Sequence, residues 1–188
     1  MLPKFRNILM ATDFSQNAWY ALHYAFSINQ QIKSSVTCMH VLPNIPQELS
    51  FSGMADVFFD YGPVGMAGVP TTPQDSKDTK KKEQAQREWI EKSTQKSTDH
   101  IKGLCLKLKK QEGYSAIQAN KIIIRIGNPI EQIIAEQKNG NYDLIVLGKR
   151  GHGKLKGPRV GGVANGVLVR SKIPVLVIDR EALKGQQA

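Results

Sequence analysis

The sequence predicts an α/β domain built on an open, doubly wound sheet of five parallel strands. Five short apolar runs, at residues 7–11, 36–42, 121–126, 142–147 and 174–178, alternate along the chain with segments of helical pattern. The runs are continuously apolar, which is typical of strands buried on both faces. Strands that alternate with helices form parallel sheets with right-handed crossovers. Ligands of such sheets bind beyond the carboxyl ends of the strands, where the strand order reverses.

The first three elements have clear boundaries. The run 7–11 (NILMA) is soon followed by Ser15, a residue type that caps helices. Apolar residues then recur at helical spacing and predict a helix over 16–31. The run 36–42 (VTCMHVL) predicts the second strand, which Pro43 ends.

A long insertion follows the second strand. Between residues 43 and 79 prolines and glycines recur without a sustained hydrophobic period, which predicts a loop. From about 80 to 110 apolar residues at spacings of three and four predict a helix, whose lysine clusters form a solvated face. We therefore expect one domain over residues 1–180, with this insertion inside it, and a tail at 181–188.

The second half repeats the alternation of strand and helix. After the β-branched run 121–126 (KIIIRI), residues 127–129 (GNP) suit the start of a helix. The run 142–147 (YDLIVL) predicts the fourth strand and leads into glycines. A helix over 163–170 and a strand over 174–178 (PVLVI) complete the pattern.

Composition excludes several classes of protein. The 188 residues carry a formal net charge of +10, and no apolar stretch approaches the ~18 residues that span a membrane. The first residues lack the apolar core of a signal peptide, so we expect a cytoplasmic protein. Cys38 and Cys105 lie in apolar contexts, as buried thiols of a reducing compartment do. The positive charge attracts any phosphate, but no RNA-binding motif or aromatic platform accompanies it, which argues against nucleic acid.

The strongest functional signal is a basic, glycine-rich segment after the fourth strand. Residues 148–162 read GKRGHGKLKGPRVGG, in which six of fifteen residues are glycine and five are Lys or Arg. Glycine lets backbone N–H groups approach phosphates, and the start of a helix favours negative charge. The segment fails the P-loop pattern at Leu155, where a hydroxyl would hold magnesium, and it has no G-x-G-x-x-G dinucleotide fingerprint. It predicts an anion site of another kind, in which we expect a side chain at Gly151 to enter the path of the phosphates.

The chain resembles the universal stress protein family. Its ATP-binding members carry G-x2-G-x9-G followed by Ser or Thr, and Gly148, Gly151 and Gly161 match that spacing. Four further blocks resemble family segments in the same order, and the likeness covers about 1–45 and 80–180. These blocks are NILMATDFS, HV at residues 40 and 41, GNP at 127–129, and GGVANGVLVRSKIPVLVI.

The resemblance implies a regulatory protein of the stress response that binds an adenine nucleotide: ATP, ADP or AMP, with or without Mg²⁺. Asp13 would lie near the adenine and ribose, and Val41 would meet the adenine edge through its backbone. The loop 148–151 would wrap the ribose and phosphates, and residues 161–163 would offer N–H groups to the phosphates. The residues implied to bind the nucleotide are Ala11, Thr12, Asp13, Val41, Gly127, Gly148, Lys149, Arg150, Gly151, Gly161, Gly162 and Val163.

Gly162 departs from the family pattern, which has Ser or Thr at this position. The missing hydroxyl weakens the hold on the outer phosphates, so ADP and AMP become plausible occupants beside ATP. Lys149, Arg150, Lys154 and Arg159 could compensate by charge. No nucleophile, base and orienting group form a set, and no cluster has metal-ligand spacing, so we expect no catalytic residue and at most weak ATP hydrolysis.

Alternative interpretations stay open. A family member that has lost its nucleotide and acts through protein contacts is favoured by Gly162. A nucleic-acid binder is suggested only by the charge, and an adenylating enzyme would need a Ser/Gly-rich loop where the chain has TDFSQNA. Asp13 could instead be a helix-capping carboxylate. His152 could contact phosphate or face solvent, and His40 is expected to be a packed histidine.

The last strand, from Pro174 to Ile178, predicts a homodimer. The resemblance places this strand at an edge of the sheet, and an exposed apolar edge pairs readily unless it is covered. Antiparallel pairing of two copies would satisfy both edges. The alternative is that residues 181–188 or the insertion fold over the edge. Protein partners other than a second copy are not identified by the sequence.

Overall fold

The computed structural model describes residues 5–46, 49, 73–112, 121–152 and 160–181. The chain forms two compact units, Met1–Pro43 together with Lys96–Ala188, and Asn44–Gln95. The elements are β1 (Asn7–Thr12), α1 (Gln16–Ile32), β2 (Ser35–Leu42), α3 (Pro73–Glu112), β3 (Lys121–Ile126), α4 (Pro129–Asn139), β4 (Leu144–Gly148), α5 (Gly162–Arg170) and β5 (Val175–Ile178).

The first unit contains a five-stranded sheet in the order β3-β2-β1-β4-β5, with every pair parallel. This arrangement confirms the predicted fold class. β1 lies in the centre, where Ile8 is in register with Val36 of β2 and with Leu144 of β4. The strand order reverses between β1 and β4, so their carboxyl ends frame the point where such sheets bind ligands.

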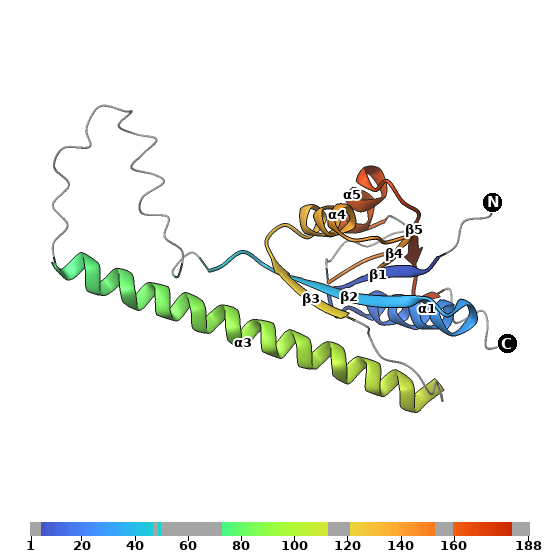
Figure 1. The fold of residues 1–188 in the computed structure, drawn as a ribbon, viewed down its shortest axis with the longest axis horizontal. Helices are drawn as coiled ribbons and strands as arrows, with labels where there is room; N and C mark the ends of the chain where they lie inside the picture. Colours follow the sequence, from blue (N-terminus) through green and yellow to red (C-terminus); the bar gives the residue numbers. More distant parts are fainter. Residues whose placement is uncertain (1–4, 47–48, 50–72, 113–120, 153–159, 182–188) are drawn as a thin grey trace. The chain divides into compact units, whose positions relative to one another are not determined.

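Helices cover both faces of the sheet (Figure 1). α1 and residues 96–112 of α3 pack on one face, in a core with Ile8 and Met10 of β1. α4 and α5 pack on the other face, in a core with Leu9. Because neighbouring residues of β1 enter different cores, the strand is apolar without alternation, as the sequence pattern predicted.

The helices around the site begin at identifiable caps. Ser15 Oγ accepts a hydrogen bond of 3.3 Å from Ala18 N and so caps α1. Asn128 Oδ1 accepts bonds from the first N–H groups of α4, and Pro129 occupies the first helical position, as predicted. α5 begins after Gly161, which offers no side-chain cap.

Two element boundaries differ from the prediction. α3 begins at Pro73 rather than near residue 80, because proline fits the first helical turn as well as it fits a loop. β4 begins at Leu144 rather than at residue 142. The carboxylate of Asp143 instead accepts hydrogen bonds from Arg6 N (2.8 Å) and Asn7 N (2.9 Å) and thereby fastens the start of β1. Most of the predicted loop and almost all of the predicted tail lie outside the described residues.

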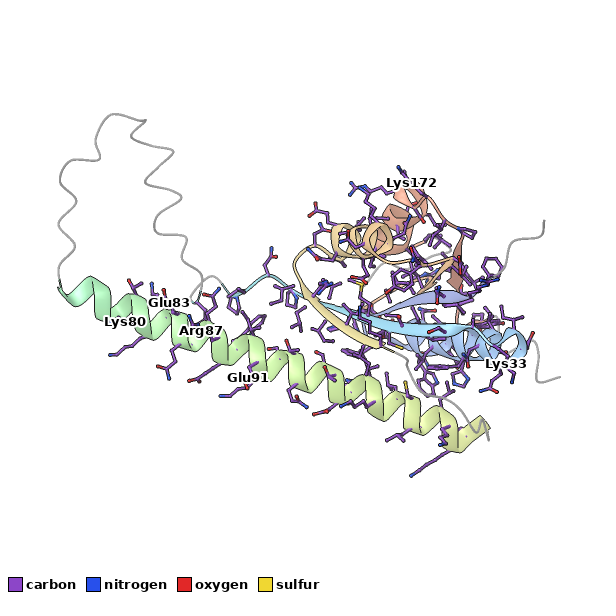
Figure 2. All side chains as sticks on the ribbon, viewed as in Figure 1. Lys33, Lys80, Glu83, Arg87, Glu91 and Lys172 are labelled. Carbon is purple, nitrogen blue, oxygen red and sulfur yellow. The ribbon has the colours of Figure 1, made fainter. Side chains whose placement is uncertain are left out.

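The second unit includes α3 up to Gln95, whose side chains are described from residue 79. Figure 2 shows Lys80, Glu83, Arg87 and Glu91 projecting from this helix, and all four are exposed. Their spacing of three and four residues places opposite charges on neighbouring turns. The predicted solvated face is thus present around Lys80.

Candidate functional site

A cavity of about 410 Å³ opens at the carboxyl ends of β1, β2 and β4, on the face that α4 and α5 cover. Its volume lies within the range of small-molecule sites, roughly 300–1,000 Å³. Eleven of the twelve residues predicted to bind the nucleotide line it. They are Ala11, Thr12, Asp13, Val41, Gly148, Lys149, Arg150, Gly151, Gly161, Gly162 and Val163.

Gly127 is the predicted residue that does not line the cavity. Its φ of 125° is a conformation that favours glycine. Its N–H donates a 3.0 Å hydrogen bond to the carbonyl of Leu42, between the ends of β3 and β2. The turn into α4 therefore accounts for this glycine without a ligand.

One wall of the cavity is apolar. Met39 and Val41 of β2 lie beside Ile133 of α4 and Leu147 of β4. Such a surface suits the face of an aromatic ring. The sequence interpretation missed Met39, Ile133 and Leu147. Met39 could have been found, because it lies two residues before Val41 and therefore on the same face of the strand.

In contrast to the apolar wall, the start of α5 supplies the cavity with backbone hydrogen-bond donors. The first hydrogen bond inside this helix runs from Asn165 N to Gly161 O at 2.9 Å. The N–H groups of Gly162, Val163 and Ala164 precede it and have no acceptor within the helix. All three residues line the cavity. N–H groups that have no acceptor within the helix, together with the positive end of the helix dipole, are suited to binding an anion.

The turn after β1 supplies the acidic group of the site. The N–H of Ser15 donates to Asp13 Oδ1 at 3.0 Å, and the N–H of Phe14 donates to Thr12 Oγ1 at 3.0 Å. Asp13 therefore does stabilise the turn that starts α1, which was one of its two predicted roles. It also lines the cavity, and its side chain is exposed. The two roles are compatible, because each carboxylate has two oxygens.

Two glycines of the loop lie close to other residues, Gly148 to backbone and Gly151 to a side chain. A Cβ on Gly148 would lie 2.7 Å from the backbone N of Ala18, in the first turn of α1. A Cβ on Gly151 would overlap Oδ2 of Asp13. The structure thus gives a different reason for Gly151 than the one expected, since a side chain there meets a carboxylate rather than open space. Gly162 differs from both, because a Cβ there would have no atom within 4 Å.

The side chain of Lys149, at the start of the loop, is already engaged. Lys149 Nζ lies 2.7 Å from Asp179 Oδ2, and this hydrogen bond lowers the pKa of Asp179 below its usual 3.8. The carbonyl of Lys149 accepts a 2.8 Å bond from Gly161 N, which joins the two ends of the glycine segment. The carbonyl of Arg150 accepts a 3.2 Å bond from Ser15 Oγ. Lys154 and Arg159 lie outside the described residues.

Two histidines bind the backbone of the β1 turn. Nδ1 of His40 lies 2.7 Å from Thr12 O, and Nε2 of His152 lies 2.8 Å from Asp13 O. Burial lowers the pKa of His40 below 6.5, against the smaller raising effects of the bond to Thr12 and the charge of Asp13. His40 is the packed histidine that was predicted. His152 is exposed, as one of its two predicted roles requires, and it also lines the cavity, so contact with a phosphate stays a prediction.

No group of three or more His, Cys, Asp or Glu side chains that could hold a metal ion occurs among the described residues. In that same part of the chain, no helix combines the length and the apolar character needed to cross a bilayer.

The sheet order and the cavity define a doubly wound α/β protein with a cavity at its switch point, where ligands of such sheets bind. The model of the universal stress protein family matches residues 60–179, which is more than half of the chain. The chain belongs to the universal stress protein family.

The chain is similar to known universal stress proteins over nearly its whole length. Universal stress protein MJ0577 of Methanocaldococcus jannaschii is 27% identical over 181 residues, which cover 96% of this chain and 99% of that protein. A solved structure of MJ0577 has a TM-score of 0.60 at 21% identity and covers 93% of this chain and 96% of its own. Universal stress protein UspA from Lactobacillus plantarum has a TM-score of 0.63 at 20% identity, over 94% of this chain and 99% of its own. The two structures show that the fold is shared.

Proposed function

We propose that the chain is a regulatory protein of the stress response that binds an adenine nucleotide in this cavity. The observation that carries the proposal is that one cavity combines an apolar wall with helix N-terminal N–H groups that have no acceptor within the helix. A nucleotide needs both, because its base is flat and weakly polar while its phosphates are anionic. Membership of the universal stress protein family supports the stress role.

Each part of the nucleotide has a suitable partner. The adenine would lie against Met39 and Val41, with the backbone of Val41 at its edge. The ribose would lie near Asp13, whose carboxylate accepts hydrogen bonds from hydroxyl groups. The phosphates would face the N–H groups of residues 161–163. A Mg²⁺ ion, if present, would be held chiefly by the phosphates, since the described residues form no metal cluster.

The nucleotide is expected to persist rather than turn over. Lys149 is paired with Asp179, and His152 is held by the backbone of Asp13, so neither is placed as a base for water. Position 162 is glycine, and no hydroxyl there holds the outer phosphates. We therefore expect AMP and ADP to compete well with ATP, and hydrolysis to be slow or absent. The missing hydroxyl also favours the second candidate, a nucleotide-free member that acts through protein contacts.

A matched pair of substitutions on α5 tests the proposal. Val163 is 40% exposed and lines the cavity, whereas Val169 is 78% exposed and does not. Val163→Asp places a negative charge beside the phosphates while it stabilises the start of the helix. At about 4 Å in a partly solvated site, the repulsion is on the order of 1–4 kcal/mol, so affinity should fall by about fivefold or more.

Calorimetric titration with ATP, ADP and AMP measures the effect, and Val169→Asp serves as the control that carries the same new charge. Mass spectrometry of small molecules released from the denatured wild-type protein identifies the natural occupant. Equal affinities of the two variants would contradict the phosphate position. A wild-type protein that binds none of the three nucleotides would favour the nucleotide-free candidate.

A further inference from the structure

Three of the four histidines in the chain contact the turn at residues 12–14. His40 and His152 bind its carbonyl groups, as described above. The third, His100, comes from α3 and contacts the turn through its ring. Its ring stacks on that of Phe14 with centroids 4.2 Å apart and an interplanar angle of 10°.

Phe14 needs such support because of its backbone. Its φ of 64° is a left-handed conformation, which a bulky residue adopts only when its surroundings hold it there. The ring of Phe14 contacts two histidine rings, and its second contact is with His40 at 4.3 Å between centroids. His40 belongs to the sheet, so its position is fixed by β2. His100 is exposed and belongs to a helix outside the sheet, so its contact is the one that can vary.

We propose that His100 is a positioning residue for the nucleotide site: its ring holds Phe14 in the left-handed conformation that places Thr12 and Asp13 at the cavity. The helix of the insertion thereby sets the affinity of a site that it does not line. This inference rests on the proposed nucleotide function. Loss of the ring lets the turn relax, and an unsupported turn must be reordered when the ligand binds, which weakens binding.

The coupling is reciprocal by thermodynamic necessity. If the contact between Phe14 and His100 strengthens nucleotide binding, bound nucleotide must strengthen the contact by the same factor. Residues 97–108 of α3 should then exchange their amide hydrogens more slowly when nucleotide is present. A partner that displaced α3 from Phe14 would lower nucleotide affinity without touching the cavity.

Three variants of the full chain separate this role from a general loss of stability. His100→Ala removes the ring, His100→Phe restores a ring that can stack, and Lys102→Ala changes an exposed neighbour on the same helix. An aromatic pair contributes enough to change affinity roughly two- to tenfold. We expect His100→Ala to weaken AMP and ATP binding by that factor, and His100→Phe and Lys102→Ala to bind within about twofold of the wild type.

Hydrogen exchange without nucleotide provides a second readout. The amides of Phe14 and Ser15 are bonded to Thr12 Oγ1 and Asp13 Oδ1, so their exchange reports the turn itself. His100→Ala should speed this exchange and His100→Phe should restore it. If exchange at the turn is the same in all variants, His100 does not position Phe14, even if nucleotide binds. If the turn responds but no variant binds any nucleotide, the proposed function fails and the inference about affinity fails with it.

Discussion

Substitution of Gly162 by serine should shift the nucleotide preference toward ATP. Gly162 is the first residue of α5, lines the cavity and has space for a side chain, because among the described residues no atom beyond its chain neighbours and its own helix lies within 4 Å of a Cβ there. A serine hydroxyl there can donate to a phosphate oxygen. Since a Cβ at this position overlaps none of the described residues, a change in the ratio of ATP to AMP affinity reports the ligand rather than repacking.

The expected magnitude follows from the charge on the acceptor. A hydrogen bond to a charged group contributes about 1.5–3 kcal/mol, which corresponds to roughly tenfold to hundredfold in affinity. The gain should appear for ATP and not for AMP if the hydroxyl reaches the outer phosphates. Serine also replaces glycine in a helix, which should raise the free energy of unfolding by about 0.5 kcal/mol without nucleotide.

Calorimetric titration of wild type, Gly162→Ser and Gly162→Ala with ATP and AMP tests this reasoning. Alanine adds the Cβ without the hydroxyl, so it should leave the ratio of ATP to AMP affinity unchanged. Chemical unfolding of the three proteins without nucleotide measures separately how much replacing glycine stabilises the helix. An unchanged ratio in the serine variant would show that position 162 does not contact the outer phosphates. A loss of ATP affinity in the alanine variant would show that the space beside Gly162 is needed by the ligand.

Two further predictions concern stability and assembly. Because burial lowers the pKa of His40, the unfolded chain binds a proton more readily than the folded protein, so the free energy of unfolding should fall as the pH drops below about 6.5. Urea unfolding should show this fall between about pH 7 and pH 5 in the wild type, and the free energy of unfolding of His40→Asn should depend less on pH. Equal pH dependence in the two proteins would contradict this role of His40. The chain should form a dimer through β5, which lies at an edge of the sheet. The carbonyls of Pro174 and Ile178 accept hydrogen bonds from the β4 side, so the N–H of Val177 faces the open edge. Val177→Pro removes that donor and should give monomers in light scattering, whereas a wild-type protein that is already monomeric at micromolar concentration would refute the dimer.

The layout of the sheet could be predicted because its signals are local. The run 121–126 agrees with β3 at both ends, and Asn128 caps α4 as its sequence context indicated. The region from Pro73 to residue 79 was interpreted as loop, because proline is common both in loops and at the first helical position. Local composition does not separate these two uses.

The site could be predicted where the chemistry lies in the backbone, and less well elsewhere. The loop at Gly148 and the start of α5 were found because glycine spacing reports backbone geometry. Gly127 was included because of the family resemblance, although its positive φ serves a turn. The stack of Phe14 on His100 was not foreseen, because the two residues are far apart in the sequence and no pattern links them. Contacts of this kind depend on the packing of a helix whose position the sequence does not specify.

The central place of β1 has a consequence for synthesis of the chain. β1 is made first, yet one of its two neighbours, β4, does not exist until residue 148 has been added. At about 5–20 residues per second, roughly 5 to 20 s pass between completion of β2 and completion of β4. Throughout that interval the nascent β1–α1–β2 segment carries an unpaired, apolar strand edge. We expect this segment to depend on chaperones while it emerges, and a stress that occupies chaperones should lower the yield of newly made protein before it affects the folded molecule.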